Sequence, residues 1–467
     1  MNLIIYYSTP PKIFQQNFLK SLQFTIKYFI IYYEPTFTFL RSTEMKKLLN
    51  MILSAALVLG MTSCKTDGQS NVIDESEVVE AYLSETAETT SAETTAETTS
   101  ETTAETTVPQ PEYSTVSFAA VGDNLIHSSI YKQANARAGG EGYDFSYAYE
   151  NVVNIIRSAD AAVINQETLI CNDVFEPSTY PLFNSPKALG DHMLDIGFDV
   201  FTIANNHTLD KGTEGLSACL DYWESKPNAV VCGAYRNTAD RDNIRTAEFE
   251  GITFSFLSYT ESLNGLRLPQ GSELIIGDSN NVDTMIAEIK KAKEISDVCI
   301  VALHWGVENS DIISDYQRSV AKQLSDAGAD VIIGNHPHVL RDIEEIERED
   351  GTVTLCAYSL GNFISAQSVG QNLIGGILEF DVSLRVDENA TDADKPIIGN
   401  IELIPIVTHY DGSYKNVRIY PLSEYTRELA ESHGVKSMSR FGYDYIFDVL
   451  KKNINEKYCD TEDYYKE

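Results

Sequence analysis

The sequence predicts an α/β fold, and two observations lead to that prediction. From Val116 onward, short apolar runs alternate with longer amphipathic stretches, which is the pattern of β-strands separated by helices. Polar residues able to bind metal follow several of these runs directly, and the carboxyl ends of strands are where an α/β sheet places its ligands. With 467 residues, 43% of them hydrophobic, the chain is long enough for one large domain with a sizeable core and appendages.

Residues 1–64 have the composition of an export signal preceded by an unrelated extension. Residues 1–44 form neither an apolar span nor an amphipathic helix, and we interpret them as an over-extended gene start. Residues 45–64 form a lipoprotein signal peptide, with two lysines, an apolar stretch, and small residues before Cys64. This ending resembles a bacterial lipobox, which implies a lipid on Cys64 and an anchor in the outer face of the cytoplasmic membrane. The alternative is a plain secretory signal in which Cys64 is incidental.

Residues 65–112 form an acidic linker rich in Thr and Glu. Glu-Thr-Thr recurs at four-residue spacing and one basic residue accompanies twelve acidic ones, so we expect a disordered tether. Residues 1–64 carry six basic and two acidic groups, so most of the net charge of −34 belongs to residues 113–467. Such an acidic surface repels nucleic acid, which we exclude as a partner, and it favours cations or basic partners. A merely solvated exterior is the simpler interpretation.

The first part of the folded body is expected to alternate strands and helices. Short apolar runs predict seven strands, at residues 116–121, 161–165, 199–204, 229–232, 252–258, 298–303 and 331–334. Amphipathic spacing predicts four helices, at residues 186–196, 213–223, 282–292 and 315–327. The first of these helices has Pro186 at its start and the last is followed by Gly328, which are the positions that these residue types favour.

The pattern changes after His338, where strands follow one another without helices between them. The turn sequence Asp350-Gly351 joins two strands of a hairpin, and two longer strands of a mixed or antiparallel sheet come next. These four strands are expected at residues 343–348, 352–359, 373–386 and 397–409. Residues 424–453 are expected to be helical. We therefore predict one domain over residues 113–420 and a C-terminal helical segment over residues 421–467.

Five predicted strands end in residues that can bind a metal ion. These residues are Asp123 with His127, Glu167, Asn206 with His207 and Asp210, His304, and the pair His336 and His338. A single histidine at a strand end is more often structural, but five of the eight histidines lie in these short polar blocks. Carboxylate, imidazole and amide oxygen without thiolate suit manganese, iron or zinc. A pair of such ions needs a bridging carboxylate, for which Glu167 is the best candidate.

Six short motifs follow one another along residues 115–370. They are Gly122-Asp123, Asn165-x-Glu167, Ala204-Asn205-Asn206-His207-x-x-Asp210, His304-Trp305-Gly306-x-Glu308, Gly334-x-His336-Pro337-His338-Val339 and Ser359-Leu360-Gly361-Asn362-Phe363. In this order they resemble the motif set of the CapA family of poly-γ-glutamate capsule biosynthesis proteins. The resemblance implies a calcineurin-like phosphoesterase fold, a four-layer metallophosphatase-like sandwich of two mixed β-sheets flanked by helices, with two divalent metal ions. The metal ligands that it implies are Asp123, Glu167, Asn206, His304, His336 and His338.

The same resemblance implies that His207 and Asp210 form a proton-donating pair beside the reacting group, with a purely structural hydrogen bond as the alternative for His207. The chain departs from the wider pattern at the first motif. Metallophosphoesterases usually begin Asp-x-His and bridge with Asp, whereas Asp123 has no histidine two residues later and the bridge would be Glu167. Whether His127 substitutes for the absent histidine is left open.

Three further polar residues are candidates for a supporting role or for contact with substrate, namely Asn205, Glu308 and Asn362. Asn362 is either a direct participant or part of a tight turn that feeds a strand. Glu308 either orients His304 or a substrate amine, or is a solvated surface residue.

The leading hypothesis from the sequence is a metal-dependent hydrolase or transferase on the bacterial cell surface. Its substrate would be an anionic polymer, poly-γ-glutamate or another capsule or wall polymer, or a phosphoester. Its partners would be other capsule synthesis or export proteins. Two alternatives stand beside it: a non-catalytic scaffold that binds polymer or export partners, and an extracellular 5′-nucleotidase-like phosphatase.

Overall fold

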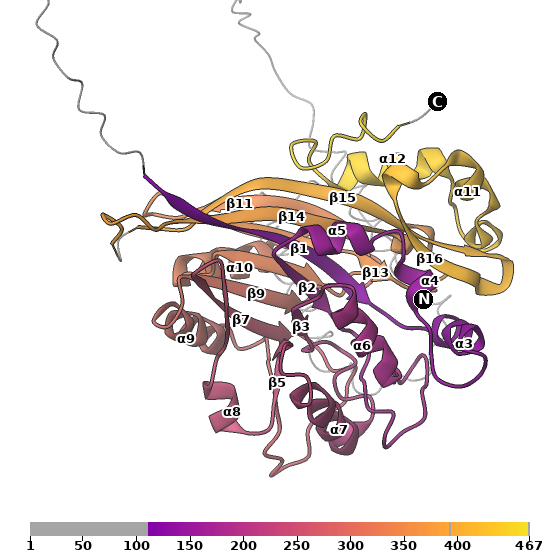
Figure 1. The fold of residues 1–467 in the computed structure, drawn as a ribbon, viewed down its shortest axis with the longest axis horizontal. Coiled ribbons are helices and arrows are strands. Elements are labelled where there is room, and N and C mark those ends of the chain that lie inside the picture. The colour runs from indigo at the N-terminus through magenta and orange to yellow at the C-terminus, as the bar shows by residue number, and fades with distance from the viewer. Residues whose placement is uncertain (1–110, 392–393, 466–467) are drawn as a thin grey trace, which may run out of the picture. The chain divides into compact units, whose positions relative to one another are not determined.

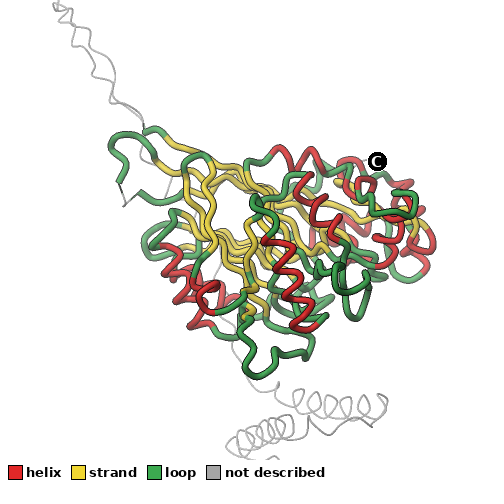
Figure 2. The backbone as a smooth tube through the Cα atoms, turned by 60° about the horizontal axis from the view of Figure 1, so that its bottom comes forward, coloured by secondary structure: helices red, strands yellow, loops and turns green. Residues whose placement is uncertain are grey.

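Two mixed β-sheets lie face to face, and helices cover their outer sides (Figure 1). The computed structural model describes residues 111–391 and 394–465. The predictions for the gene-start extension, the signal peptide, Cys64 and residues 65–110 of the linker lie outside the described residues. In Figure 2 the strands are gathered in the middle of the described part and the helices surround them. Within that part, every helix is too short or too polar to cross a lipid bilayer.

The first sheet has eight strands in the order β16-β15-β14-β1-β2-β3-β4, and β13 pairs with β1 beside this path. Strands β1 to β4 run parallel, whereas β14, β15 and β16 run antiparallel to their neighbours. The bounds are β1 (Tyr113–Asn124), β2 (Ala161–Asn165), β3 (Val200–Thr202), β4 (Val230–Cys232), β13 (Asn362–Ile364), β14 (Ile374–Arg385), β15 (Ile397–Asp411) and β16 (Lys415–Pro421).

The second sheet has six strands in the order β11-β12-β10-β9-β7-β6. Its four central strands are parallel, and the two edge strands are antiparallel to them. The bounds are β6 (Arg245–Phe249), β7 (Ile252–Thr260), β9 (Val298–His304), β10 (Val331–Asn335), β11 (Leu340–Glu347) and β12 (Val353–Leu360). A separate two-stranded ribbon joins β5 (Ala234–Tyr235) to β8 (Ile275–Ile276).

Helices form the outer layers. The last helix before β10, α10, occupies the predicted range 315–327, because Ser314 and Gln317 form a capping box at its start and Gly328 ends it in the left-handed conformation (φ 112°). The helices are α3 (Ser128–Arg137), α4 (Ser146–Tyr149), α5 (Val153–Ser158), α6 (Lys187–Asp195), α7 (Gly212–Glu224), α8 (Thr238–Asp242), α9 (Val282–Lys293), α10 (Asp315–Ala327), α11 (Arg427–Ser432) and α12 (Tyr443–Asn453).

Alternate residues of the central strands fill the space between the sheets. The ring of Phe118 on β1 lies 5.0 Å from that of Phe254 on β7, and it stacks on Phe380 of β14 at 5.1 Å. Along β9, Ile300 joins this core, whereas its neighbour Val301 belongs to a second core with α9 and α10. Burial of each such side chain contributes about 1.5–3 kcal/mol. The predicted α/β sandwich of two mixed sheets flanked by helices is confirmed.

The structure also contains elements that the sequence pattern did not predict. β13 has three residues, too few for a periodic signal, and β6 is an edge strand with two charged residues, Arg245 and Glu248, among its five. The segment predicted as helical over residues 424–453 is instead two helices, α11 and α12, with Gly434 and Gly442 between them. Glycine destabilises a helix interior, which explains the interruption.

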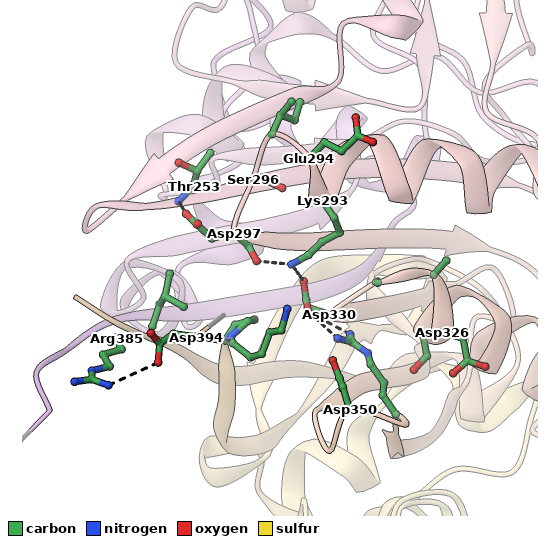
Figure 3. Close-up of a pocket in the computed structure, with 18 of the residues that line it drawn as sticks. Thr253, Lys293, Glu294, Ser296, Asp297, Asp326, Asp330, Asp350, Arg385 and Asp394 are labelled. Atoms are coloured by element: carbon green, nitrogen blue, oxygen red, sulfur yellow. Dashed lines mark hydrogen bonds and ion pairs between the residues drawn. The ribbon is translucent and has the colours of Figure 1, made fainter. Parts of the chain in front are cut away.

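The amino-terminal ends of β9 and β10 are tied together by a buried ion pair. A hollow of about 780 Å³ there is lined by charged residues (Figure 3). Asp330, 2% exposed, accepts hydrogen bonds from Lys293 Nζ at 2.9 Å, from the backbone N–H of Cys299 at 2.8 Å and from Arg348 at 3.1 Å. This network joins α9, β9 and the β11–β12 hairpin, and it leaves the opposite, carboxyl ends of the strands for the site.

Candidate metal centre

Residues from five strand ends meet in one buried cluster. Two groups of three side chains have potential ligand atoms within 4.8 Å of one another: Glu167, His304 and His336 form one, and Asp123, Glu167 and His338 form the other. Glu167 belongs to both groups. The sixth predicted ligand, Asn206, contacts the first group through Oδ1, which lies 3.0 Å from His304 Nε2. The fold therefore brings all six predicted metal ligands together.

Glu167 is the residue whose surroundings most clearly suit a bound cation. Its side chain is fully buried, and neither carboxylate oxygen has a hydrogen-bond partner among the described residues. The two nearest basic atoms are His304 Nε2 at 3.7 Å and His338 Nδ1 at 3.9 Å. Burial, and next the charge of Asp123, raise the pKa of Glu167 well above its ordinary value. An unpaired buried carboxylate is costly, and a divalent cation beside each oxygen would remove that cost.

Asp123 and His338 form one side of the cluster. His338 Nδ1 lies 2.9 Å from Asp123 Oδ2 and 3.0 Å from Asn362 Oδ1, and Asn165 Nδ2 donates to Asp123 Oδ1 at 2.7 Å. Burial by itself lowers the pKa of His338, but the charges of Glu167 and Asp123 outweigh it and raise that pKa to about 9. This side of the cluster is thus rich in negative charge and suits a cation.

His304 and His336 form the other side. Their ring nitrogens Nε2 and Nδ1 lie 3.0 Å apart. Burial lowers the pKa of His304 well below its ordinary value and that of His336 to about 4, so both imidazoles are neutral at neutral pH. Two neutral imidazoles, a carboxylate oxygen of Glu167 and the amide oxygen of Asn206 form a donor set that suits manganese, iron or zinc.

The turn that carries His336 and His338 is strained. His336 has a φ of 95° and His338 a φ of 58°, which non-glycine residues adopt at a cost of about 1–3 kcal/mol each. The turn is held by a hydrogen bond from the backbone N–H of Asn309 to the carbonyl of Pro337 at 2.8 Å. Strain that the surroundings maintain at a buried histidine pair is typical of a functional site.

His207 and Asp210 lie beside the cluster as a fixed pair. His207 Nδ1 lies 2.8 Å from Asp210 Oδ2, and the same oxygen accepts a hydrogen bond from the backbone N–H of Phe183 at 2.6 Å. The Phe183 ring packs edge-on against the His207 ring, 4.7 Å between centroids. Asn205 shapes the preceding turn, because its Oδ1 accepts from the backbone N–H of His207 at 3.0 Å. The imidazole is thereby held in one orientation.

Two residues that the sequence singled out, His127 and Glu308, belong to neither group of ligands. His127 Nδ1 lies 3.2 Å from both the carbonyl of Leu125 and the backbone N–H of Ala366, so it faces backbone atoms. Glu308 is exposed, and no hydrogen bond among the described residues joins it to His304. The role of orienting His304 falls on Asn165 instead, whose Nδ2 lies 3.3 Å from His304 Nδ1. Asn165 is the first residue of the second motif, and its place two residues before Glu167 is the sequence signal from which this role could have been predicted.

Comparison with known proteins identifies a family. The model of the bacterial capsule synthesis protein PGA_cap matches residues 117–367. The chain is 32% identical over 217 residues to the PGA biosynthesis protein CapA of Bacillus subtilis (strain 168), which covers 46% of this chain and 52% of that protein. It is 32% identical over 177 residues to the capsule biosynthesis protein CapA of Bacillus anthracis, over 37% of this chain and 41% of that one. The chain spans about half the length of these curated relatives.

Among solved structures, a phosphatase from Mycoplasma pneumoniae is similar with a TM-score of 0.38 and 13% identity, over 63% of this chain and 95% of that one. The resemblance that the six motifs predicted is confirmed by the family match, which contains all six of them. Because that match covers more than half of the sequence, the chain belongs to the bacterial capsule synthesis protein family PGA_cap.

Proposed function

We propose that the chain is a metal-dependent hydrolase or transferase with two metal ions, acting on a capsule or cell-wall polymer. The observation that supports this most directly is the buried, unpaired carboxylate of Glu167, which is shared by two groups of ligand atoms. One ion would be held by Asp123, Glu167 and His338. The other would be held by Glu167 with the side chains of Asn206, His304 and His336. Manganese, iron and zinc all suit these donors.

Bound metal ions would supply a Lewis acid and a water molecule of lowered pKa. The protein supplies the rest. Asp210 fixes the His207 ring through Nδ1, so Nε2 is the atom that would donate a proton to the leaving group. Glu167 is fully buried, which keeps bulk water from its carboxylate. The reaction class is hydrolysis or transfer at a phosphoester or an amide, with His207 as the acid.

Membership of a capsule synthesis family supports a polymer substrate, and the relatives named for PGA biosynthesis and capsule biosynthesis support poly-γ-glutamate as the first polymer to test. Other capsule or wall polymers and phosphoesters belong to the same proposal. We further propose that a lipid on Cys64 anchors the protein at the outer face of the cytoplasmic membrane, where other capsule synthesis or export proteins would be its partners.

The test is metal content and metal-dependent hydrolysis of the full chain, with wild type compared with His304→Ala. We expect about two equivalents of metal in the wild type. In the variant we expect loss of the equivalent on the His304 side and of turnover of poly-γ-glutamate and aryl phosphates. His192→Gln is the matched control, since His192 on α6 packs against Phe145 and Tyr149 and belongs to neither group of ligands.

A non-catalytic scaffold is the second candidate. The first motif favours it, because the position two residues after Asp123 holds Leu125 and not the histidine that metallophosphoesterases usually have there. A wild-type chain that contains no metal and turns over no phosphoester or γ-glutamyl amide would reject the enzyme proposal. Polymer binding that survives chelation would then support the scaffold.

A further inference from the structure

The two sides of the metal centre differ in the number of donors assigned so far. The side with His304 has four, because the amide oxygen of Asn206 joins a carboxylate oxygen and two imidazoles. The side with His338 has three, namely Asp123, Glu167 and His338. First-row divalent ions in proteins usually take at least four ligands, which raises the question of what completes this side.

Asn362 lies at the open position. It begins β13, and its Cα pairs in parallel register with that of Asp123 on β1. The side chain is 1% exposed, and Oδ1 lies 3.0 Å from His338 Nδ1, the same atom that lies 2.9 Å from Asp123 Oδ2. With metal–ligand bonds of about 2.0–2.2 Å, neighbouring ligand atoms stand about 3 to 3.5 Å apart, so these spacings suit three ligands of one ion.

The amide of Asn362 is oriented so that its oxygen faces the cluster. Nδ2 donates to the carbonyl of Asn372 at 2.7 Å, to Gln367 Oε1 at 2.8 Å and to Ser365 Oγ at 3.1 Å. All three of these atoms can accept, which fixes the nitrogen on their side and leaves Oδ1 towards His338. An amide oxygen held in this way is a preorganised ligand rather than a solvated group.

The backbone around Asn362 is built for close approach to β1. A Cβ on Gly122 would lie 1.9 Å from the carbonyl oxygen of Gly361, and the backbone N–H of Asp123 donates to that oxygen at 2.9 Å. Gly361 itself has a φ of 66°, a conformation that glycine adopts without strain. The glycines of the first and last motifs thus serve one purpose, which is to place Asn362 beside Asp123.

We propose that the side-chain oxygen of Asn362 is a metal ligand and completes the Asp123, Glu167 and His338 side of the centre, as Asn206 completes the other side. The inference rests on the proposed function, since it assumes that the centre holds metal. It also assigns the open position to Asn362 and not to His127, whose Nδ1 faces the backbone of Leu125 and Ala366.

The experiment compares four full-length proteins after chelation and reloading with manganese(II) alone: wild type, Asn362→Leu, Asn362→Asp and His127→Ala. Asn151→Leu is the matched control, because the Asn151 amide donates to the carbonyl of Ile419 and belongs to neither group of ligands. Metal per chain is counted by elemental analysis, and affinity is measured by calorimetric titration.

We expect Asn362→Leu to lose one of about two equivalents, or to bind it at least tenfold more weakly, while Asn362→Asp and His127→Ala keep both. The Asp variant separates a ligand from a purely structural amide, because it keeps the oxygen and loses the three donated hydrogen bonds. Two equivalents with unchanged affinity in the Leu variant, loss in both Asn362 variants, or loss in His127→Ala would each overturn the assignment.

A measurement without any substitution covers the case in which the Leu variant does not fold. In a crystal structure of the manganese-loaded wild type, Oδ1 of Asn362 should contact an ion, and an oxygen out of contact overturns the assignment. Wild-type protein that binds no manganese would instead reject the proposed metal centre as a whole, so the two failures are distinguishable.

Discussion

At the scale of single residues, Glu167 is held in an environment that opposes its own charge. Its pKa is raised by burial and by Asp123, and its oxygens have no hydrogen-bond donor among the described residues. Without metal, an amide in its place should therefore be tolerated or even preferred. We predict that Glu167→Gln, in the presence of chelator, unfolds at the same temperature as the wild type or a few degrees higher.

The same substitution should abolish the response to metal, because each group of ligands loses its shared carboxylate. Calorimetric melting with chelator and with manganese(II) measures both effects. Glu379→Gln is the control, since Glu379 on β14 also has a raised pKa through burial but lies outside the cluster. A chelated Glu167→Gln protein that is markedly less stable than the wild type would contradict this account of the carboxylate.

His433 makes a pH-dependent contribution to stability that is separate from the metal centre. Its Nε2–H donates to the carbonyl of Thr408 and its Nδ1 accepts from the backbone N–H of Val435, both at 3.0 Å. Burial and, to a smaller extent, the nearby His409 lower its pKa to about 4, whereas the hydrogen bond to Thr408 and the charge of Asp411 oppose that shift. Below about pH 6.5, His433 binds a proton in the unfolded chain but stays neutral in the folded chain until the pH reaches about 4. The free energy of unfolding should therefore fall as the pH is lowered from 6.5 to about 4.

The expected contribution is on the order of 3 kcal/mol, which His433→Gln should remove from the acid limb of the stability curve. Urea unfolding at several pH values in chelator measures it, since titration of the cluster histidines is then common to both proteins. Identical slopes for the two proteins between pH 6.5 and 4 would refute the prediction.

The ligand residues could be predicted from the sequence because each directly follows an apolar strand, and parallel strands bring their carboxyl ends to one edge. His304, which ends the buried β9, is such a case. The contacts of Asn165 and Asn362 could not be predicted from the positions of the apolar strands. Asn165 acts through two side chains on different strands, and Asn362 depends on a three-residue strand whose partner is remote in sequence.

At the scale of elements, the buried ion pair of Asp330 ties α9, β9 and the β11–β12 hairpin at the end of the sheet away from the cluster. Asp330→Ala would leave the backbone N–H of Cys299 without its acceptor and would remove the carboxylate that pairs with Lys293 and Arg348. We predict a loss of about 3 kcal/mol in the free energy of unfolding. Metal content should be unchanged, because the cluster lies at the opposite strand ends.

Denaturant titration measures that loss, and the exposed Lys322–Asp326 pair on α10 supplies the comparison. Asp326→Ala should cost less than about 1 kcal/mol, because water screens an exposed pair. Equal losses in the two variants would show that burial of Asp330 does not strengthen its interactions.

The bounds of α10 could be predicted from the sequence because a capping box begins this helix and a glycine ends it. The edge strand β6 could not be predicted, because its charged residues leave no apolar run.

At the scale of the whole molecule, the metal centre draws ligands from both sheets. Asp123 and Glu167 lie at the carboxyl ends of strands of the eight-stranded sheet, whereas His304, His336 and His338 lie at the carboxyl ends of strands of the six-stranded sheet. The stacking of the two sheets is predictable from their apolar runs, but which strand ends face each other depends on the strand order. Metal bound at this place would link the two sheets directly.

Removal of metal should therefore lower the stability of the entire fold and not only that of the site. At a free metal concentration of 100 to 1,000 times Kd, bound metal adds about 3–4 kcal/mol to the free energy of unfolding. For a domain of about 350 residues we predict that chelation lowers the melting temperature by roughly 4–5 °C and that manganese(II) restores it. Scanning calorimetry on wild type and His304→Ala measures both. The variant, which keeps the Asp123, Glu167 and His338 group, should show a smaller shift than the wild type. A wild-type melting temperature that is unchanged by chelation would mean that the two sheets are held together by their apolar core alone.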